Sequence, residues 1–319
     1  MTKKIFPITS FLSDISADLG RQSLPPSPQP DPTIRRLVIV GDVHGMRKSL
    51  EALLDKVNFN QQQGDHLILV GDLVNKGPDS PGVVDLAIKL GASAVRGNHD
   101  NAVLDAAAEM KAARDSLLQS GDLTRNQAVA ENPQADQLSD LDTAVTSNGE
   151  RHSEATQKTA TELSTGQLDW LASLPLILRV NLPDHLKSSL GETLVVVHAG
   201  LVPNVPLTEQ DPHTIMHMRS LIRTLGEEDG FIPAETMGEE GWVVEWNRWQ
   251  EQQASKTTVI FGHDAKRRLQ LGRYTIGLDS GCLYGHQLSA VVIAAPNGEI
   301  EHRIVQVECT DAACPISGS

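Results

Sequence analysis

Short runs of consecutive apolar residues recur along this chain, and each is followed by a glycine or a polar residue. The runs have the length of β-strands and are rich in β-branched residues. Strands that are apolar on both sides are buried on both faces, so the pattern predicts a layered α/β domain. The runs are LVIV before Gly41, HLILV before Gly71, SAV before Arg96, TLVVV before His198, TTVIF before Gly262, YTIGL before Asp279, and LSAVVIAA at 288–295.

Two amphipathic stretches lie between the first three runs. Residues 46–57 carry leucines at helical spacing, and residues 80–91 have a proline near the start and a glycine at the end, as helices commonly do. The first hundred residues therefore predict the order β-α-β-α-β, with polar residues at the carboxyl end of each strand. In open α/β sheets that edge is where ligands bind.

The pattern also predicts the domain boundaries. Residues 1–33 end in the proline-rich sequence LPPSPQPDP, which continues neither a helix nor a sheet, so we expect a flexible N-terminal tail. Residues 34–305 form the predicted domain, and residues 306–319 form a C-terminal tail. Residues 104–166 interrupt the pattern with an alanine-rich helical piece followed by a polar stretch. We expect an insertion there, a helical flap followed by a mobile loop, acting as a lid over the site.

Composition and charge narrow the class of protein. The 319 residues are 39% hydrophobic and 21% charged, as in globular proteins. A formal net charge of −14 argues against a broad nucleic-acid or membrane surface, although a local pocket can still bind an anion. No window is apolar over the length that a membrane span needs, and the N-terminus makes a poor secretory signal. We therefore expect a cytoplasmic protein.

The three cysteines are Cys282, Cys309 and Cys314. Their number is odd and they lack CxxC spacing, which predicts neither a disulfide framework nor a zinc knuckle. We therefore expect reduced cysteines in a reducing compartment.

Six polar clusters follow the predicted strands: GDVHG, GDLVNKGP, RGNHD, HAG, FGHD and GLDSGC. Singly, each has an ordinary explanation, such as a helix cap, a turn or a buried histidine. Together, their order and position favour a metal site. Carboxylate, amide and imidazole donors without a thiolate suit Mn²⁺, Fe²⁺, Zn²⁺ or Co²⁺. Seven donors exceed one tetrahedral site, so we expect two divalent ions with a bridging carboxylate, a common device for phosphoester hydrolysis. The candidates are Asp42, His44, Asp72, Asn98, His99, His198 and His263.

In this order the motifs resemble those of the calcineurin-like metallophosphoesterases of the phosphoprotein-phosphatase superfamily. The resemblance covers roughly residues 36–100 and 193–295 and is closest to the symmetrical diadenosine tetraphosphatase and fungal polyphosphatase branch. It implies an α/β/β/α sandwich with the metal site at the strand ends. It also implies that Asp42 and His44 bind the first metal and that Asp72 bridges, with the second metal held by Asn98, His198 and His263.

By the same resemblance, His99 is the general acid beside the leaving oxygen. The sequence departs from the protein phosphatases in the GDLVNKGP motif, because Asn75 and Lys76 stand where those enzymes have an Asp-Arg pair. Asn75 can orient the imidazole of His99 but cannot stabilise its charged form. Lys76 offers phosphate a point charge in place of a bidentate fork. Arg219 and Arg223, which follow the HAG motif, are the further candidates for binding phosphate.

Other residues have two interpretations each. Arg96 either points into the site or supports its loop, and Asp100 is expected to be a structural partner of that loop. Trp246 and Trp249 are expected in the core, with stacking on a nucleobase as the alternative. The DAKRRLQ segment after His263 adds three more cations that favour a polyanion: Lys266, Arg267 and Arg268.

The function that we expect is metal-dependent hydrolysis of a phosphate-containing substrate, either dinucleoside polyphosphate or inorganic polyphosphate. The alternative is a protein Ser/Thr phosphatase, whose substrate would be a phosphoprotein. A non-catalytic scaffold would have lost metal ligands, yet all six are present together with His99. The sequence leaves open the metal's identity and the oligomeric state.

Overall fold

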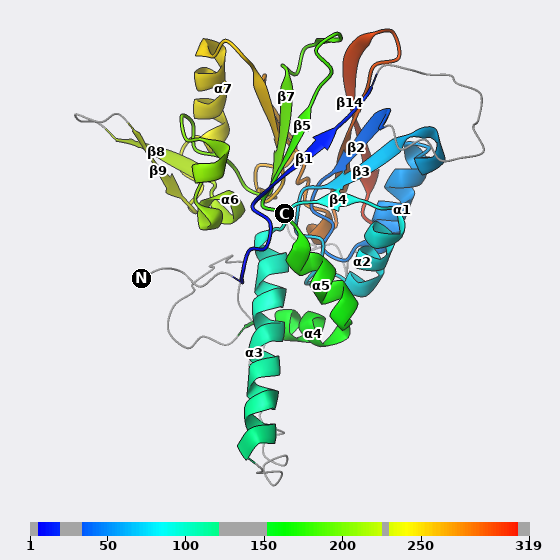
Figure 1. Ribbon diagram of the computed structural model, residues 1–319, viewed down its shortest axis with the longest axis vertical. Coiled ribbons are helices and arrows are strands. Elements are labelled where there is room, and N and C mark those ends of the chain that lie inside the picture. The colour runs from blue at the N-terminus through cyan, green and yellow to red at the C-terminus, as the bar shows by residue number, and fades with distance from the viewer. Residues whose placement is uncertain (1–5, 20–33, 121–151, 225–229, 312–319) are drawn as a thin grey trace.

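The computed structural model describes residues 6–19, 34–120, 152–224 and 230–311 (Figure 1). The helices in these ranges are α1 Arg47–Lys56, α2 Ser80–Lys89, α3 Asn98–Ser120, α4 Glu154–Glu162, α5 Thr165–Ser173, α6 Pro212–His217 and α7 Trp242–Gln252. The strands are β1 Leu12–Ser16, β2 Arg36–Val40, β3 Asp65–Leu69, β4 Ser93–Ala94, β5 Ile177–Asn181, β6 Lys187–Ser188, β7 Thr193–Val197, β8 Ser220–Thr224, β9 Gly230–Ala234, β10 Thr257–Phe261, β11 Gln270–Leu271, β12 Thr275–Gly277, β13 Gln287–Ala294 and β14 Glu299–Glu308.

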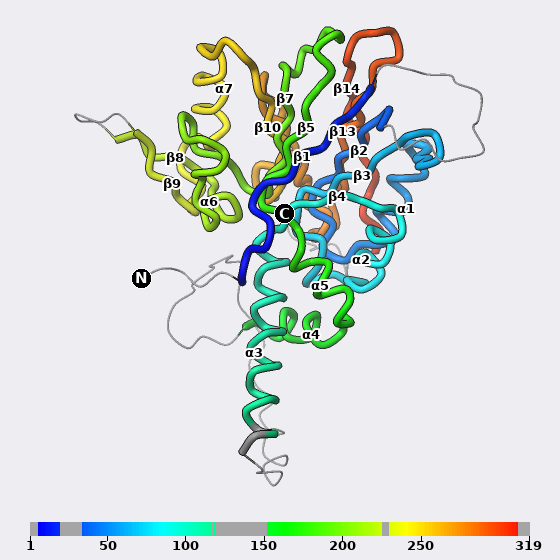
Figure 2. The backbone as a smooth tube through the Cα atoms, in the orientation of Figure 1, coloured from blue at the N-terminus to red at the C-terminus, as the bar shows by residue number. Residues whose placement is uncertain are grey.

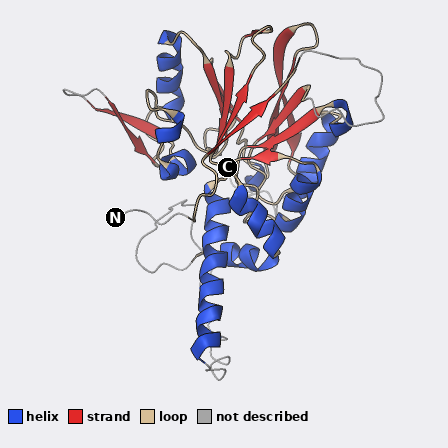
Figure 3. Cartoon of the chain, in the orientation of Figure 1, coloured by secondary structure: helices blue, strands red, loops and turns tan. Residues whose placement is uncertain are grey.

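Two six-stranded sheets form the centre of the molecule (Figure 3). One has the order β1-β5-β7-β10-β12-β11 and the other the order β4-β3-β2-β13-β14-β6. Their facing sides share one hydrophobic core, to which β2 contributes Leu37 and Ile39 and β7 contributes Val196. The neighbouring β2 residues Val38 and Val40 point the other way, into a core shared with the helices. Strand β2 is thus buried on both faces, as its continuous apolar run predicts.

Helices cover the two outer faces (Figure 2). Helices α1, α2, α3 and α5 pack on the second sheet, whereas α6 and α7 pack on the first. Trp242 and Trp246 of α7 are buried in that outer core, and Trp249 packs against it. The α/β/β/α layering is therefore confirmed, and the tryptophans belong to the core.

Side chains cap the N-termini of α2 and α5. Asp79 caps α2 by accepting the N–H of Gly82, and a proline occupies the first turn. Ser164 caps α5 in a reciprocal capping box with Gln167. Among the described residues, no helix is long and apolar enough to cross a bilayer.

The prediction of an N-terminal tail over residues 1–33 is wrong for β1. This strand pairs in parallel with β5, from Leu12 opposite Ile177 to Ser16 opposite Asn181. The guanidinium of the fully buried Arg96 holds the segment just before it, donating to the backbone carbonyls of Phe6 and Pro7. Arg96 therefore supports the loop and the N-terminal strand. The proline-rich part of the predicted tail lies outside the described residues.

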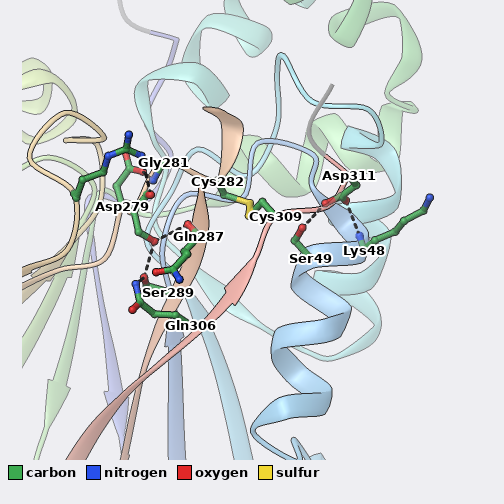
Figure 4. The surroundings of a disulfide bond; sticks show 12 residues. Lys48, Ser49, Asp279, Gly281, Cys282, Gln287, Ser289, Gln306, Cys309 and Asp311 are labelled. Atoms are coloured by element: carbon green, nitrogen blue, oxygen red, sulfur yellow. Dashed lines mark hydrogen bonds between the residues drawn. A yellow bond between two sulfur atoms is a disulfide. The ribbon is translucent and has the colours of Figure 1, made fainter. Parts of the chain in front are cut away.

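The prediction of a C-terminal tail from residue 306 is wrong as far as the structure is described. Strand β14 continues to Glu308, and Asp311 accepts hydrogen bonds from the backbone N–H of Lys48 and from the hydroxyl of Ser49 (Figure 4). These contacts fasten the chain end to α1. The remainder of the predicted tail is not among the described residues.

The prediction that the cysteines remain unpaired is also wrong. Cys282 and Cys309 form a disulfide between the loop after β12 and the end of β14 (Figure 4). They are 27 residues apart in sequence, but the antiparallel β13–β14 pairing brings their Cα atoms to 5.3 Å. That proximity comes from strand register, which cysteine spacing alone does not reveal. Cys314 lies beyond the described part of the chain.

The predicted insertion begins inside a long helix. Helix α3 starts at Asn98 and projects from the body of the molecule, and α4 and α5 pack beside its base (Figure 1). Helix α4 falls in the stretch predicted to be a mobile loop, so that prediction is wrong for residues 154–162. Residues 121–151 lie outside the described ranges.

Candidate metal centre

The polar clusters meet at one edge of the molecule because they follow strands that run in parallel. Strands β2, β3 and β4 are mutually parallel in one sheet, and β7 is parallel to β10 in the other. Parallel strands present their carboxyl ends on the same side. The six predicted metal ligands follow these strands directly: Asp42 and His44 after β2, Asp72 after β3, Asn98 at the start of α3 after β4, His198 after β7 and His263 after β10.

Asp72 lies at the centre of this group. Its Oδ2 atom is 3.6 Å from Nε2 of His44, and its Oδ1 atom is 3.4 Å from Nε2 of His198. Two sets of donors are close enough to hold an ion, namely His44, Asp72 and His99, and Asp42, Asp72 and His198. Asp72 belongs to both sets, which is the position that a bridging carboxylate requires.

Asn98 joins the two remaining ligands. Its Oδ1 atom lies 2.9 Å from Nε2 of His198 and 3.2 Å from Nδ1 of His263. Asp42 borders the same side, because both of its carboxylate oxygens accept the backbone N–H of His263 at 3.0–3.2 Å. The structure thus groups Asn98 with His198 and His263, as the family resemblance implies. Asp42 and His198 also belong to one set of possible donors with Asp72.

Each of the three histidines that are predicted to bind metal, His44, His198 and His263, has one ring nitrogen at a backbone carbonyl. A carbonyl accepts only, so that nitrogen carries the proton and the other nitrogen presents a lone pair toward the centre of the site. Outer partners of this kind orient metal-binding histidines. The pairs are His44 Nδ1 with the Val74 carbonyl at 3.4 Å, His198 Nδ1 with the Val70 carbonyl at 3.0 Å, and His263 Nε2 with the His217 carbonyl at 3.2 Å.

The backbone of the site is shaped closely around the donors. Gly97 lies so near Asp72, and Gly262 so near Asp42, that a Cβ atom at either glycine would collide with the carboxylate. His44, Asp72 and His263 all have positive φ angles, of 45°, 50° and 67°. Such backbone is costly for residues other than glycine and persists where the surrounding structure holds it in place.

Burial and charge act on the donors in opposite directions. Burial, and then the charges of Asp279 and Asp72, raise the pKa of Asp42 well above its ordinary value. Burial alone would raise the pKa of Asp72 too, but the charge of His198, followed by those of His99 and His44, holds it well below its ordinary value. Several buried acids and imidazoles are thus packed into one small volume.

Burial and neighbouring charge also act in opposite directions on the pKa values of the imidazoles. Burial lowers the pKa of His44, and it lowers the pKa of His263 well below the ordinary value. The pKa of His198 is raised, because the carboxylate of Asp72 outweighs the burial of the ring. Buried carboxylates beside lone-pair nitrogens and an amide oxygen are suited to divalent cations, so the residues present fit the predicted metals.

The predicted partner of His99 is in contact with it. The Nδ2 atom of Asn75 lies 3.2 Å from Nδ1 of His99, and Asn75 is buried. The backbone N–H of His99 donates to Oδ1 of Asp72 at 2.9 Å. His99 therefore lies between Asp72, a predicted metal ligand, on one side and Asn75 on the other.

The predicted phosphate-binding residues have different surroundings. Lys76 is exposed and immediately follows Asn75. Arg219 lies near enough to His263 that its charge, after burial and His198, contributes to lowering the pKa of that histidine. Arg223 is exposed on β8 and forms an ion pair with Glu245 at 2.7 Å.

Two of the three cations after His263 contact groups of the neighbouring loops. Arg267 pairs with Asp264 at 2.6 Å. Arg268 donates to the carbonyl of Ser280 at 3.0 Å. Both guanidinium groups thus support the neighbouring loops.

Asp100 has the expected structural role. Its Oδ1 atom accepts the backbone N–H groups of Leu73 and Val74, and its Oδ2 atom accepts that of Gly97. Asp100 thereby fixes the loops that carry Asp72 and Asn98 relative to each other. Burial, together with the charge of Asp72, raises its pKa to about 6.

Some contributors to the site were missed at the level of sequence. Thr156 of α4 is buried and accepts a hydrogen bond from Nδ2 of Asn75 at 3.0 Å. His217 supplies the carbonyl that orients His263. The backbone carbonyls leave no signal in side-chain patterns, and Thr156 lies in a polar stretch whose spacing to the motifs is unconstrained.

Comparison with known proteins agrees with this geometry. Residues 35–288 match the family model described as calcineurin-like phosphoesterase. The zinc-dependent endopolyphosphatase of Saccharomyces cerevisiae is 27% identical over 86% of this chain and 82% of its own length. A symmetrical bis(5'-nucleosyl)-tetraphosphatase of Paracidovorax citrulli is 28% identical over 88% of this chain and 99% of its own.

A solved structure supports the same assignment. The crystal structure of a protein provisionally identified as a diadenosine tetraphosphatase superposes with a TM-score of 0.61 at 31% identity, covering 94% of this chain and 98% of that one. The family match contains strands of both sheets and the positions of all six predicted metal ligands. The chain therefore belongs to the calcineurin-like metallophosphoesterases and is a hydrolase.

Proposed function

We propose that this hydrolase cleaves phosphoanhydride bonds, with dinucleoside polyphosphate or inorganic polyphosphate as its substrate. The proposal rests chiefly on one observation: two sets of possible metal donors share Asp72 at the edge of the sheets. The imidazole of His99 lies at the same edge, with its Nδ1 atom 3.2 Å from the amide nitrogen of Asn75. The named activities of the tetraphosphatase and endopolyphosphatase relatives support this substrate class.

Each residue has a defined part in this proposal. Asp42, His44, Asp72, Asn98, His198 and His263 would hold two divalent ions of the group Mn²⁺, Zn²⁺, Fe²⁺ and Co²⁺. When bound, such ions acidify water and neutralise phosphate oxygens. His99 directs a ring N–H to the leaving oxygen, and Asn75 positions its ring. Lys76 and Arg219 supply positive charge for further phosphates of the substrate.

A protein Ser/Thr phosphatase is the second candidate. One observation favours it: a serine/threonine-protein phosphatase of Salmonella typhimurium is 45% identical, although only over 74 residues, which is 23% of this chain. Asn75 argues against it, since it removes the carboxylate that the protein phosphatases place beside this histidine.

The test is hydrolysis after metal exchange. The protein is stripped of metal and reloaded separately with Mn²⁺, Zn²⁺ or Co²⁺. Cleavage of diadenosine tetraphosphate, long-chain polyphosphate and a phosphoserine peptide is then compared. We expect the two phosphoanhydrides to be cleaved at least about tenfold faster than the peptide. No turnover of any substrate with any of the metals would refute the proposal, and a preference for the peptide would favour the second candidate.

A further inference from the structure

We propose that Asn75, held by Thr156, makes His99 a fixed hydrogen-bond donor and thereby selects leaving groups that depart as phosphate anions. The proposal rests on the function proposed above and explains how the same site would prefer phosphoanhydrides. It assigns a specificity-determining role to Asn75 and a positioning role to Thr156. The role of Thr156 does not follow from the motifs.

The orientation of the Asn75 amide is fixed by its neighbours. Its Oδ1 atom accepts the backbone N–H of Lys76 at 2.9 Å. A flipped amide would set two donors against each other there, so the NH₂ group must point the other way. The two hydrogens of that group are directed to the hydroxyl of Thr156 at 3.0 Å and to Nδ1 of His99 at 3.2 Å.

This orientation fixes the proton on His99. Because Asn75 donates to Nδ1, that nitrogen must accept, and the ring proton resides on Nε2. A doubly protonated ring would direct its Nδ1–H at the NH₂ group of Asn75, donor against donor. An aspartate at this position would instead accept from Nδ1–H and stabilise the charged ring, as a carboxylate does beside other catalytic histidines.

The consequence concerns the leaving oxygen. As water attacks phosphorus, the new P–O bond forms and the old one breaks. The electron pair of the broken bond goes to the leaving oxygen, and the proton lost by the water goes to solvent. A phosphate leaving group accepts this charge as a stable anion, for which a hydrogen bond from Nε2–H of His99 suffices. The alkoxide of a serine or threonine needs a full proton, which a neutral imidazole cannot release without becoming a strongly basic anion.

Thr156 makes the arrangement rigid. It lies in the first turn of α4, and its hydroxyl oxygen is 2.8 Å from that of Ser153, the residue that caps the helix. His152, one residue earlier, pairs with Glu109 of α3 at 3.4 Å, on the same helix whose first turn carries His99. The returning end of the insertion thus holds the Asn75 amide against the ring. A segment that only covered the substrate as a lid would not need this contact between Thr156 and Asn75.

The test compares Asn75→Asp with wild type on two substrates, polyphosphate and a phosphoserine peptide, in the metal-loaded full-length protein. We expect the ratio of kcat/KM for the peptide to that for polyphosphate to rise by about ten- to a hundredfold, the scale of a hydrogen bond to a charged group. The matched control is Asn60→Asp, which adds the same charge where Asn60 caps the turn at residues 61–63, and which should leave the ratio unchanged. An unchanged ratio in Asn75→Asp overturns the proposal.

A second readout does not depend on turnover. Imidazole ¹⁵N and ¹³C chemical shifts report which ring nitrogen of His99 is protonated. We expect the Nε2–H form in wild type and a proton on Nδ1 in Asn75→Asp. Protonation of Nδ1 in the wild-type protein overturns the proposal even if Asn75→Asp fails to fold.

Thr156→Val and Thr156→Ser test the positioning role. Valine keeps the shape of threonine but leaves an N–H of Asn75 without its acceptor, whereas serine keeps the hydroxyl. We expect kcat on polyphosphate to fall about tenfold in Thr156→Val with KM unchanged, and to recover in Thr156→Ser. A lower melting temperature with unchanged kcat would show a merely structural role.

Absence of all turnover in wild type would refute the proposed function itself, whereas turnover that is indifferent to these variants refutes only this inference.

Discussion

The histidines of this site fall into two groups that differ in what lies behind the ring. His44, His198 and His263 are each backed by a backbone carbonyl, whereas His99 is backed by the NH₂ group of a side-chain amide. An acceptor behind the ring leaves a lone pair in front, as a metal ligand needs. A donor behind the ring leaves an N–H in front, as a leaving oxygen needs.

The two groups also differ in how the fold supports them. The carbonyls behind His44 and His198 belong to Val74 and Val70, in the loop after β3, so they come with the sandwich itself. The carbonyl behind His263 belongs to the last residue of α6, which packs on the outer face of the first sheet. The amide behind His99 depends on Thr156, in a helix that interrupts the sandwich sequence. The predicted metal-binding half therefore depends mainly on the central layers, whereas the proposed leaving-group half depends on an added element. Substitutions that affect only one of the two groups of histidines test this comparison.

Replacing Asp72 by asparagine should have the largest effect, because it removes the carboxylate that both donor sets share. We expect metal affinity to fall by more than about 100-fold, since even outer partners of metal ligands contribute 10–100-fold. Turnover of every substrate should be lost in parallel. Metal content after dialysis and steady-state rates measure the two effects. Retention of two ions per chain by Asp72→Asn would contradict the shared position of Asp72.

Replacing His99 by alanine should affect only the leaving-group half. We expect kcat to fall by about 10²–10³, the usual cost of removing one donor aimed at developing charge. Metal content should stay at the wild-type value, because a ring whose Nδ1 accepts from Asn75 carries its proton on Nε2 and offers no lone pair to an ion. Dialysis against chelator followed by metal analysis supplies the comparison. A loss of metal equal to that of Asp72→Asn would place His99 in the ligand group.

A smaller effect should appear in the stability of the metal-free protein. Burial is the main cause that raises the pKa of Asp279 to about 6 from an ordinary 3.8. Between about pH 4 and pH 6 the folded chain therefore holds a proton that the unfolded chain has lost. The contribution of Asp279 to the free energy of unfolding thus falls as the pH rises through this window and levels off above it.

Asp279→Asn isolates this contribution, because the amide oxygen can still accept the N–H of Gly281. We expect the variant to gain stability relative to wild type from pH 4 to pH 6, by at most about 3 kcal/mol. Urea unfolding in the presence of chelator, at four or five pH values, measures the difference. A difference that is independent of pH would show that burial does not hold the proton on Asp279.

The fold, and the convergence of the predicted metal ligands at one edge of it, were largely predictable from the sequence. Continuous apolar runs identify strands that are buried on both faces. Parallel strands then bring Asp42, Asp72 and His198 to one edge, independently of the conformation of the loops. Strand β1 was missed because LSDIS contains too few apolar residues, and it is recognisable only by its pairing with β5. Thr156 was missed for a related reason: a long insertion separates it from Asn75, and only tertiary packing brings the two together.

The central claim is that the group behind each ring decides whether the nitrogen facing the site carries a proton or a lone pair. Titration of metal-free protein with Zn²⁺, followed by histidine ¹⁵N spectra, tests this claim. Zinc should shift Nε2 of His44, Nε2 of His198 and Nδ1 of His263 to the values of coordinated nitrogens. Nε2 of His99 should remain protonated throughout the titration. Coordination of zinc by His99, or a protonated front nitrogen on any of the other three in the loaded protein, would contradict the account.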